Sequence, residues 1–211
     1  MSHNRSAPIK GLYVITPDEP DTAVLLRKVE AALQGGAKIL QYRNKAANMT
    51  LRLQQAKVLR ELSQAFSVPL IINDGVMLAR QVDADGVHLG SEDGSIVGAR
   101  AVLGSGKFIG VSCYNRKDLA HEAVRQGADY VAFGSFFASA VKPDAVSASP
   151  ELLHQARREI SVPLVAIGGI TVENGAQLLE AGADALAVIS AVFGAMDIRD
   201  AARQFANLNY P

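Results

Sequence analysis

Short apolar runs alternate along the chain with segments in which Leu and Ala return at helical spacing. The runs are rich in Val, Ile, Phe and Tyr and are bounded by Gly, Pro or Asp, which is typical of buried strands. A segment such as LRLQQAKVLRELSQAF places Arg, Gln and Glu opposite its Leu residues, as an amphipathic helix does. The pattern therefore predicts alternating strands and helices that form a parallel sheet.

We predict eight strands from the apolar runs. They cover Gly11–Thr16, Lys38–Arg43, Pro69–Asp74, Gly86–Gly90, Phe108–Ser112, Tyr130–Gly134, Pro163–Gly169 and Ala185–Ser190. The predicted fold class is α/β: residues 1–211 form a single compact (β/α)8 TIM barrel with parallel strands, and residues 1–10 are a candidate flexible N-terminal extension. An open doubly wound sheet is the alternative, but no G-x-G-x-x-G turn follows the first strand.

Composition excludes several classes of partner. The chain has 21 basic and 21 acidic residues, so it lacks the basic excess of a protein that binds nucleic acid along its surface. No apolar run is long enough to span a membrane, and MSHNRSAPIK lacks the apolar core of a secretory signal. The lone Cys113 can form neither an internal disulfide nor a thiolate cage, so we expect a cytoplasmic protein. A homo-oligomer stays open.

Cationic side chains follow the second predicted strand. In a (β/α)8 barrel the carboxyl ends of the strands build the active site. The run QYRNK places Gln41, Arg43 and Lys45 at alternating positions, which project the same way from an extended strand. Two cations and an amide at the barrel mouth favour an anionic ligand. The alternative is that these are ordinary solvated surface charges.

Two carboxylates are expected at the same rim. Asp74 ends the third predicted strand, and Asp93 follows the fourth in HLGSEDG. Beside Arg43, Lys45 and Lys142, these carboxylates would hold a hard cation such as Mg²⁺, which usually binds one or two carboxylates and phosphate oxygens. The alternative is that both aspartates cap the helices that follow them.

The last two strands carry a candidate phosphate site. Gly168 and Gly169 follow VAI, and VIS precedes a helical stretch that begins near Ser190. Backbone N–H groups at these two strand ends form the phosphate site of many barrels. The alternative is that the two glycines only turn the chain.

Three other features favour structural roles. His88 in GVHLG is interpreted as a barrel histidine whose hydrogen bonds are satisfied, because no second histidine lies nearby in the sequence. Cys113 follows a strand end, but no basic partner for it can be identified. Asp83 and Asp85 are expected to serve the turn before the fourth strand.

The order of motifs along the chain resembles that of the thiamine phosphate synthase family. These motifs are QYRNK, IND, GVHLGSED, GVS, a lysine in the long loop after the sixth strand, IGGI and VIS. The match covers nearly the whole chain. The resemblance implies a transferase that joins a hydroxymethylpyrimidine diphosphate to a thiazole phosphate and releases pyrophosphate. It implies two small-molecule substrates, and Mg²⁺ as cofactor on Asp74 and Asp93.

The resemblance also implies a role for each matching residue. The diphosphate would be held by Gln41, Arg43, Lys45, Asn73 and Lys142, and the thiazole phosphate by Ser139, Gly169, Ile189 and Ser190. Ser112 would lie near the pyrimidine, and Ser112, Arg43 and Lys142 would be the catalytic residues. Because departure of diphosphate needs charge neutralisation more than a general base, we expect a dissociative substitution without a covalent enzyme intermediate.

One motif departs from the family pattern. The family usually has Thr-x-Thr-Lys after the sixth strand, whereas this chain has Ser139, Ala140, Val141 and Lys142. Val141 offers no hydroxyl to a phosphate. The loop 135–149, which contains Val141, is the predicted lid. Other functions stay open: a thiazole tautomerase or regulatory relative on the same barrel, a sugar phosphate isomerase, and a phosphate-binding module without turnover.

Overall fold

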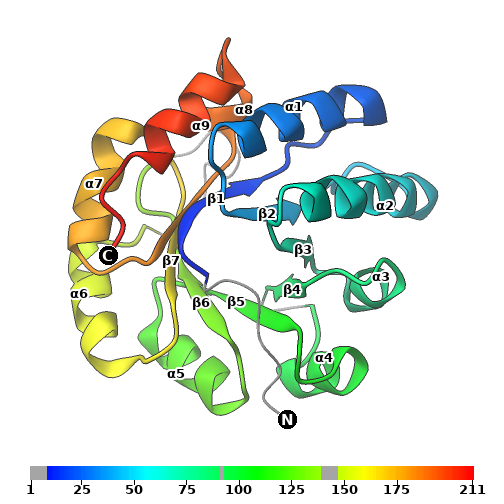
Figure 1. The fold of residues 1–211 in the computed structure, drawn as a ribbon. Coiled ribbons are helices and arrows are strands. Elements are labelled where there is room, and N and C mark those ends of the chain that lie inside the picture. The colour runs from blue at the N-terminus through cyan, green and yellow to red at the C-terminus, as the bar shows by residue number, and fades with distance from the viewer. Residues whose placement is uncertain (1–8, 91–92, 139–146) are drawn as a thin grey trace.

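The computed structural model describes residues 9–90, 93–138 and 147–211, and within them eight parallel strands close into a barrel (Figure 1). Strands adjacent in the chain are adjacent in the barrel, and β8 pairs with β1. The strands are β1 (Gly11–Ile15), β2 (Ile39–Tyr42), β3 (Leu70–Asn73), β4 (Gly86–Leu89), β5 (Phe108–Tyr114), β6 (Tyr130–Phe133), β7 (Leu164–Ile167) and β8 (Ala185–Val188). The predicted (β/α)8 barrel is confirmed, and the open sheet is excluded.

Helices surround the barrel, and the last of them packs beside the first (Figure 1). They are α1 (Thr22–Gln34), α2 (Met49–Ala65), α3 (Val76–Gln81), α4 (Ile96–Leu103), α5 (Lys117–Arg125), α6 (Pro150–Glu159), α7 (Val172–Glu180), α8 (Ser190–Phe193) and α9 (Ile198–Ala206). Side-chain caps begin several of them, as where Asp21 accepts hydrogen bonds from the N–H groups of Ala23 and Val24. No described helix is long and apolar enough to cross a membrane.

Several strands end earlier than the sequence predicted. Asp74, Gly168 and Gly169 have φ values of +62°, +106° and +60°, so the extended conformation stops before them. These residues therefore begin the loops of the rim instead of ending strands. In contrast, β5 runs on to Tyr114, past a register shift between Ser112 and Tyr114.

The barrel interior combines large and small side chains. Tyr13 and Tyr130 are buried there with Phe108, Val165 and several Ile residues, while alanines from β6 and β8 supply the small positions. Gly110 is required for this packing, because a Cβ at that position would collide with the ring of Tyr130. A second apolar layer fills the space between strands and helices.

Three aspartate–arginine pairs close the amino ends of the strands, and we call them the amino-end clamps. Each aspartate stands one residue before a strand and also accepts an N–H from the first or second residue of the preceding strand. The clamps are Asp85 with Arg60 and the Leu70 N–H, Asp129 with Arg100 and the Ile109 N–H, and Asp184 with Arg157 and the Leu164 N–H. The expected turn role of Asp85 is confirmed. Because this face lies opposite the strand ends that build the site, the clamps contribute stability.

We predict that Asp184→Ala lowers the melting temperature without changing turnover. Asp184 Oδ2 lies 2.7 Å from both Arg157 Nη1 and the Leu164 nitrogen, and its loss leaves both donors without that acceptor. Such a loss amounts to about 1–3 kcal/mol, or a fall of several degrees for a chain of this size. Differential scanning calorimetry measures the shift.

The matched control is Glu122→Ala, which breaks the exposed pair between Glu122 and Arg125 on α5. Exposed pairs contribute little, so this variant should melt close to wild type. An Asp184→Ala protein that melts no lower than Glu122→Ala would contradict the role of the clamps.

Candidate active site

The loop after β2 is held in place by the loop after β1. The Thr16 hydroxyl accepts the Arg43 N–H at 2.9 Å and donates to the Arg43 carbonyl at 2.8 Å. Asp18 Oδ1 accepts the Lys45 N–H at 2.8 Å and lies 3.3 Å from the Arg43 guanidinium. The backbone that carries both cations is therefore ordered by the protein itself.

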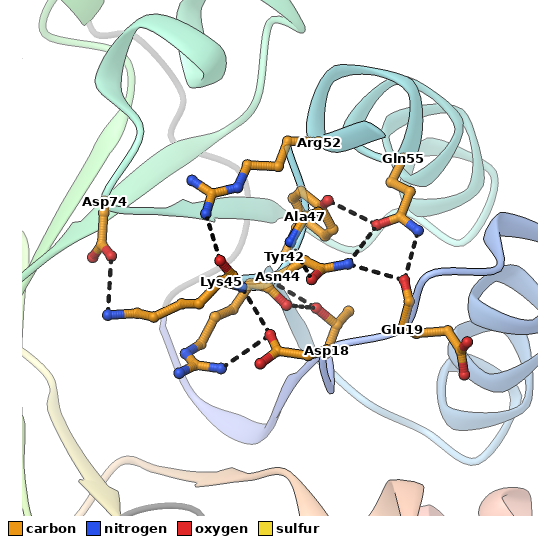
Figure 2. Close-up of polar contacts among 11 residues, drawn as sticks. Asp18, Glu19, Tyr42, Asn44, Lys45, Ala47, Arg52, Gln55 and Asp74 are labelled. Carbon is orange, nitrogen blue, oxygen red and sulfur yellow. Dashed lines mark hydrogen bonds and ion pairs between the residues drawn. The ribbon is translucent and has the colours of Figure 1, made fainter. Parts of the chain in front are cut away.

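Buried amides fasten the same loop to α2 (Figure 2). Asn44 and Gln55 donate to the Glu19 carbonyl at 2.9 and 2.8 Å, and the Tyr42 hydroxyl donates to Gln55 Oε1 at 2.8 Å. Since buried polar groups are costly unless paired, this network specifies one loop conformation.

A cavity of about 540 Å³ lies beside this loop at the ends of β2, β3 and β4. Polar groups of both signs line it: Arg43, Lys45, Arg52, Asn73, Asp74 and Asp93. The described lining does not include Gln41. Cations and carboxylates from three separate loops therefore meet in one place, although they are up to 50 residues apart in the chain.

The two carboxylates interact with each other. Burial, and then the nearby Asp93 carboxylate, raise the pKa of Asp74, while Lys45 at 3.6 Å opposes the shift. Asp74 also adopts a left-handed φ of +62°, a conformation that is uncommon for non-glycine residues but that Asp takes more readily than most.

Neither carboxylate caps a helix. The N-cap of α3 is Gly75 without a side-chain hydrogen bond, and α4 is capped by Ser95. Asp93 Oδ2 instead accepts the Gly90 N–H at 2.8 Å. The capping alternative is therefore wrong for both residues, and a close pair of carboxylates suits a hard divalent cation. The described residues contain no group of three or more potential metal ligands, so water or a bound ligand would complete such a site.

The alternation argument for QYRNK fails beyond Tyr42. Because β2 ends there, only Gln41 follows the strand pattern, and it points into the barrel interior with 3% of its surface exposed. Its amide nitrogen donates to the Tyr13 hydroxyl at 2.7 Å. Arg43 and Lys45 reach the cavity from the loop, through the contacts with Thr16 and Asp18.

Ser112 lies on the inner side of β5, where its hydroxyl is 2.9 Å from His88 Nε2. The other ring nitrogen of His88 lies 3.1 Å from the Tyr130 hydroxyl, so the interpretation of His88 as a satisfied barrel histidine is confirmed. Cys113 packs in the outer apolar layer, and burial raises the pKa of its thiol to about 12. This cysteine has no thiolate to offer at neutral pH.

The ends of β7 and β8 bring the candidate phosphate residues together. Gly168 and Gly169 also let the chain after β6 approach closely: the Phe137 N–H donates to the Gly168 carbonyl, and a Cβ on either glycine would collide with that segment. Ile189 precedes α8 and Ser190 is its first residue, with Ser190 exposed. The glycines therefore serve packing as well as turning. Ser139, Val141 and Lys142 lie outside the described residues.

Sequence reasoning missed Asp18, Thr16 and Arg52. Arg52 Nη2 donates to the Lys45 carbonyl at 3.1 Å (Figure 2). Its Nε is buried and has no hydrogen-bond partner among the described residues. A usable signal was present for all three, because Thr16 and Asp18 directly follow β1 and Arg52 lies in the first turns of α2. In a (β/α)8 barrel these positions border the rim.

A second cavity of about 540 Å³ lies near the amino ends of β6 and β7, beside Arg100, Gly127 and Asp129. Arg100 is already engaged there by Asp129 and by the carbonyls of Gly104, Lys107 and Gly127. Its cation is occupied in holding the clamp, so we assign no site to this cavity.

Comparison with known proteins identifies relatives of the whole barrel. The family model described as thiamine monophosphate synthase matches residues 12–192. A curated thiamine-phosphate synthase from Methylobacillus flagellatus is 54% identical over 99% of both chains, and one from Nitrosospira multiformis is 54% identical over 95% of this chain and 86% of the relative. Among solved structures, a thiamine phosphate pyrophosphorylase from Pyrococcus furiosus matches with a TM-score of 0.83 and 38% identity, over 92% of this chain and 93% of that one.

We predict that Asp74→Asn does not destabilise the metal-free protein at neutral pH. The folded pKa of Asp74 lies above its unfolded value, so ionisation of Asp74 lowers stability as pH rises through that interval. Asparagine removes this penalty and tolerates a left-handed φ. In EDTA at pH 7 we expect a melting temperature equal to wild type or up to about 3 °C higher, with the difference vanishing in acid.

Asp118→Asn on α5 is the control, because ionisation of Asp118 has the opposite effect on the stability of the folded state. The Arg116 guanidinium lowers the pKa of Asp118, so ionisation of Asp118 favours the folded state and its removal cannot raise the melting temperature at pH 7. A clear loss of stability in Asp74→Asn would contradict the repulsion inferred between Asp74 and Asp93.

Proposed function

The chain belongs to the thiamine monophosphate synthase family and is a transferase with thiamine-phosphate synthase activity; from that premise we propose which residues carry out each part of the reaction. The proposal rests mainly on one observation. Arg43, Lys45, Asp74 and Asp93 line the same cavity of about 540 Å³ at the carboxyl ends of the strands.

Arg43 and Lys45 bind the diphosphate of the pyrimidine substrate, together with Asn73 from the end of β3. A guanidinium recognises phosphate oxygens through several N–H groups, and an ammonium adds a compact charge. Because Thr16 and Asp18 already hold the backbone of Arg43 and Lys45, little of the binding free energy is spent on ordering the loop.

Asp74 and Asp93 fit Mg²⁺ by the chemistry of their oxygens, and burial together with the nearby Asp93 carboxylate raises the pKa of Asp74. When bound there, the ion would neutralise charge that develops on the leaving diphosphate. The Lys45 ammonium, which lies 3.6 Å from Asp74, would then leave this carboxylate and contact a phosphate oxygen of the substrate.

The pyrimidine lies deeper, over the barrel interior, where Ser112 offers it a hydrogen bond. Gln41, which the resemblance assigns to the diphosphate, is not part of the described cavity lining and lies in the interior, so we assign it to the pyrimidine instead. The thiazole phosphate binds at the ends of β7 and β8, on the backbone around Gly169 and on Ile189 and Ser190. Ser139 and Lys142 are the further phosphate contacts expected from the sequence, and both lie outside the described residues. This arrangement places the two substrates on the same rim.

In the proposed reaction the bond between the pyrimidine methylene carbon and the diphosphate oxygen breaks, and its electron pair leaves with pyrophosphate. The thiazole nitrogen then donates its lone pair to that carbon. No proton transfer is needed in either of these two steps. Catalysis consists of charge stabilisation by Arg43 and Lys45, with Lys142, and of substrate orientation.

The partners are small molecules, as for the relatives, and the balanced charge of 21 basic and 21 acidic residues offers no general nucleic-acid surface. We propose a cytoplasmic location, which is consistent with a chain whose single cysteine, Cys113, is free.

We predict that the protein releases pyrophosphate only when both thiamine precursors and Mg²⁺ are present. A coupled pyrophosphate assay, with and without EDTA, measures this directly. Activity that persists undiminished in EDTA would overturn the magnesium proposal, whereas no release with magnesium present would overturn the proposed roles of the rim residues.

We predict that Lys45→Met lowers kcat/KM for the pyrimidine diphosphate at least about 100-fold, because it removes one charge from the leaving-group site. Steady-state kinetics at saturating thiazole phosphate test the effect. Lys57→Met, which removes an exposed lysine from the same loop-helix segment, is the control and should behave like wild type. Equal kinetics for the two variants would remove Lys45 from the proposed site.

A further inference from the structure

A chain of hydrogen bonds crosses the barrel interior from one side to the other. Gln41 Nε2 lies 2.7 Å from the Tyr13 hydroxyl, which lies 2.9 Å from the Tyr130 hydroxyl. Tyr130 is 3.1 Å from His88 Nδ1, and His88 Nε2 is 2.9 Å from the Ser112 hydroxyl. Five strands supply the five side chains, and we call them the interior chain.

The two tyrosines of the interior chain are neutral links. Tyr13 and Tyr130 are 1% and 0% exposed, and burial raises the pKa of both hydroxyls far above neutrality. Each hydroxyl therefore has one proton to donate, and each can accept more than one hydrogen bond.

The identity of the group at one end determines the direction of every bond. The Gln41 amide nitrogen can only donate, so Tyr13 accepts from it. Among the described residues Tyr130 is the remaining partner of Tyr13, so Tyr13 donates to Tyr130. Tyr130 then donates to His88 Nδ1, which leaves the ring proton on Nε2 and makes Ser112 the acceptor of that proton.

The reverse direction leaves a buried donor unpaired. If Tyr130 donated to Tyr13, the Tyr13 hydroxyl would accept twice and its own proton would have no described acceptor. If His88 were doubly protonated, its Nδ1 would donate to the Tyr130 hydroxyl, and the proton of that hydroxyl would have no described acceptor. A buried donor without an acceptor is strongly disfavoured in a dry interior.

We propose that Tyr13, Tyr130 and His88 are positioning residues, which keep the His88 proton on Nε2 and thereby make Ser112 a hydrogen-bond donor toward the rim. With its oxygen occupied by His88, Ser112 directs its own proton to an acceptor atom of the pyrimidine diphosphate. This last step rests on the proposed function. Ser112 then acts neither as a nucleophile nor as a base, because His88 donates to it and does not withdraw its proton.

The first test is independent of substrate. Long-range ¹H–¹⁵N NMR of the uniformly ¹⁵N-labelled full chain distinguishes the two neutral tautomers, and the signal lost in His88→Gln identifies His88 among the four histidines. We expect the proton on Nε2 near neutral pH. A proton on Nδ1, or a doubly protonated ring, would overturn the proposal.

The second test breaks the interior chain in its middle. Tyr13→Phe removes the donor that orients Tyr130 and keeps the ring that fills the core. We expect His88 to become a mixture of tautomers and kcat to fall about tenfold. The control is Tyr210→Phe, which removes a buried hydroxyl that has no hydrogen-bond partner in the described part of the chain and should change neither the tautomer nor kcat.

A purely structural role for Tyr13 would give a different result. Tyr13→Phe would have a lower melting temperature, but the folded protein would keep the wild-type His88 tautomer and the wild-type kcat. This outcome would overturn the proposal. A wild-type protein that shows the Nε2 tautomer but releases no pyrophosphate would overturn the proposed residue roles and leave the direction of the interior chain intact.

Discussion

Closure of a parallel barrel is the constraint on which the rest of this structure depends. Because every strand runs the same way, the carboxyl ends of all eight meet at one rim, and the amino ends meet at the other. Side chains that are far apart in the chain, such as Arg43 and Asp93, therefore line one cavity. The same closure encloses an interior with no water-facing sheet edge, in which any polar side chain must find a protein partner.

The two ends of the barrel meet different demands. At the amino ends each aspartate of a clamp faces an arginine and a backbone amide, so opposite charges are paired. At the rim Asp74 lies near a second carboxylate and adopts a left-handed conformation, and burial and this neighbour raise its pKa. Opposite charges are therefore paired at the amino ends, whereas like charges meet at the rim where we propose that substrate binds.

Preorganisation links the fold to the proposed chemistry. Thr16 and Asp18 order the cationic loop, and the interior chain orders Ser112, both before a ligand arrives. In a substitution that depends on charge stabilisation, groups already in position need no reorganisation during the reaction. Glycine contributes at one decisive place, since Gly110 makes room for the Tyr130 ring that carries the interior chain.

The sequence by itself determined the eight strands, their parallel order and the polar character of the rim, because strand and helix periodicities and turn residues act locally. It also indicated His88 as a satisfied core residue. It did not determine where Arg43 and Lys45 point, since β2 ends at Tyr42 and contacts with Thr16 and Asp18 from another loop decide their place. Nor did it reveal Arg52 or the partners of Gln41. Those depend on which side chains meet when the barrel closes, and only the tertiary structure decides that.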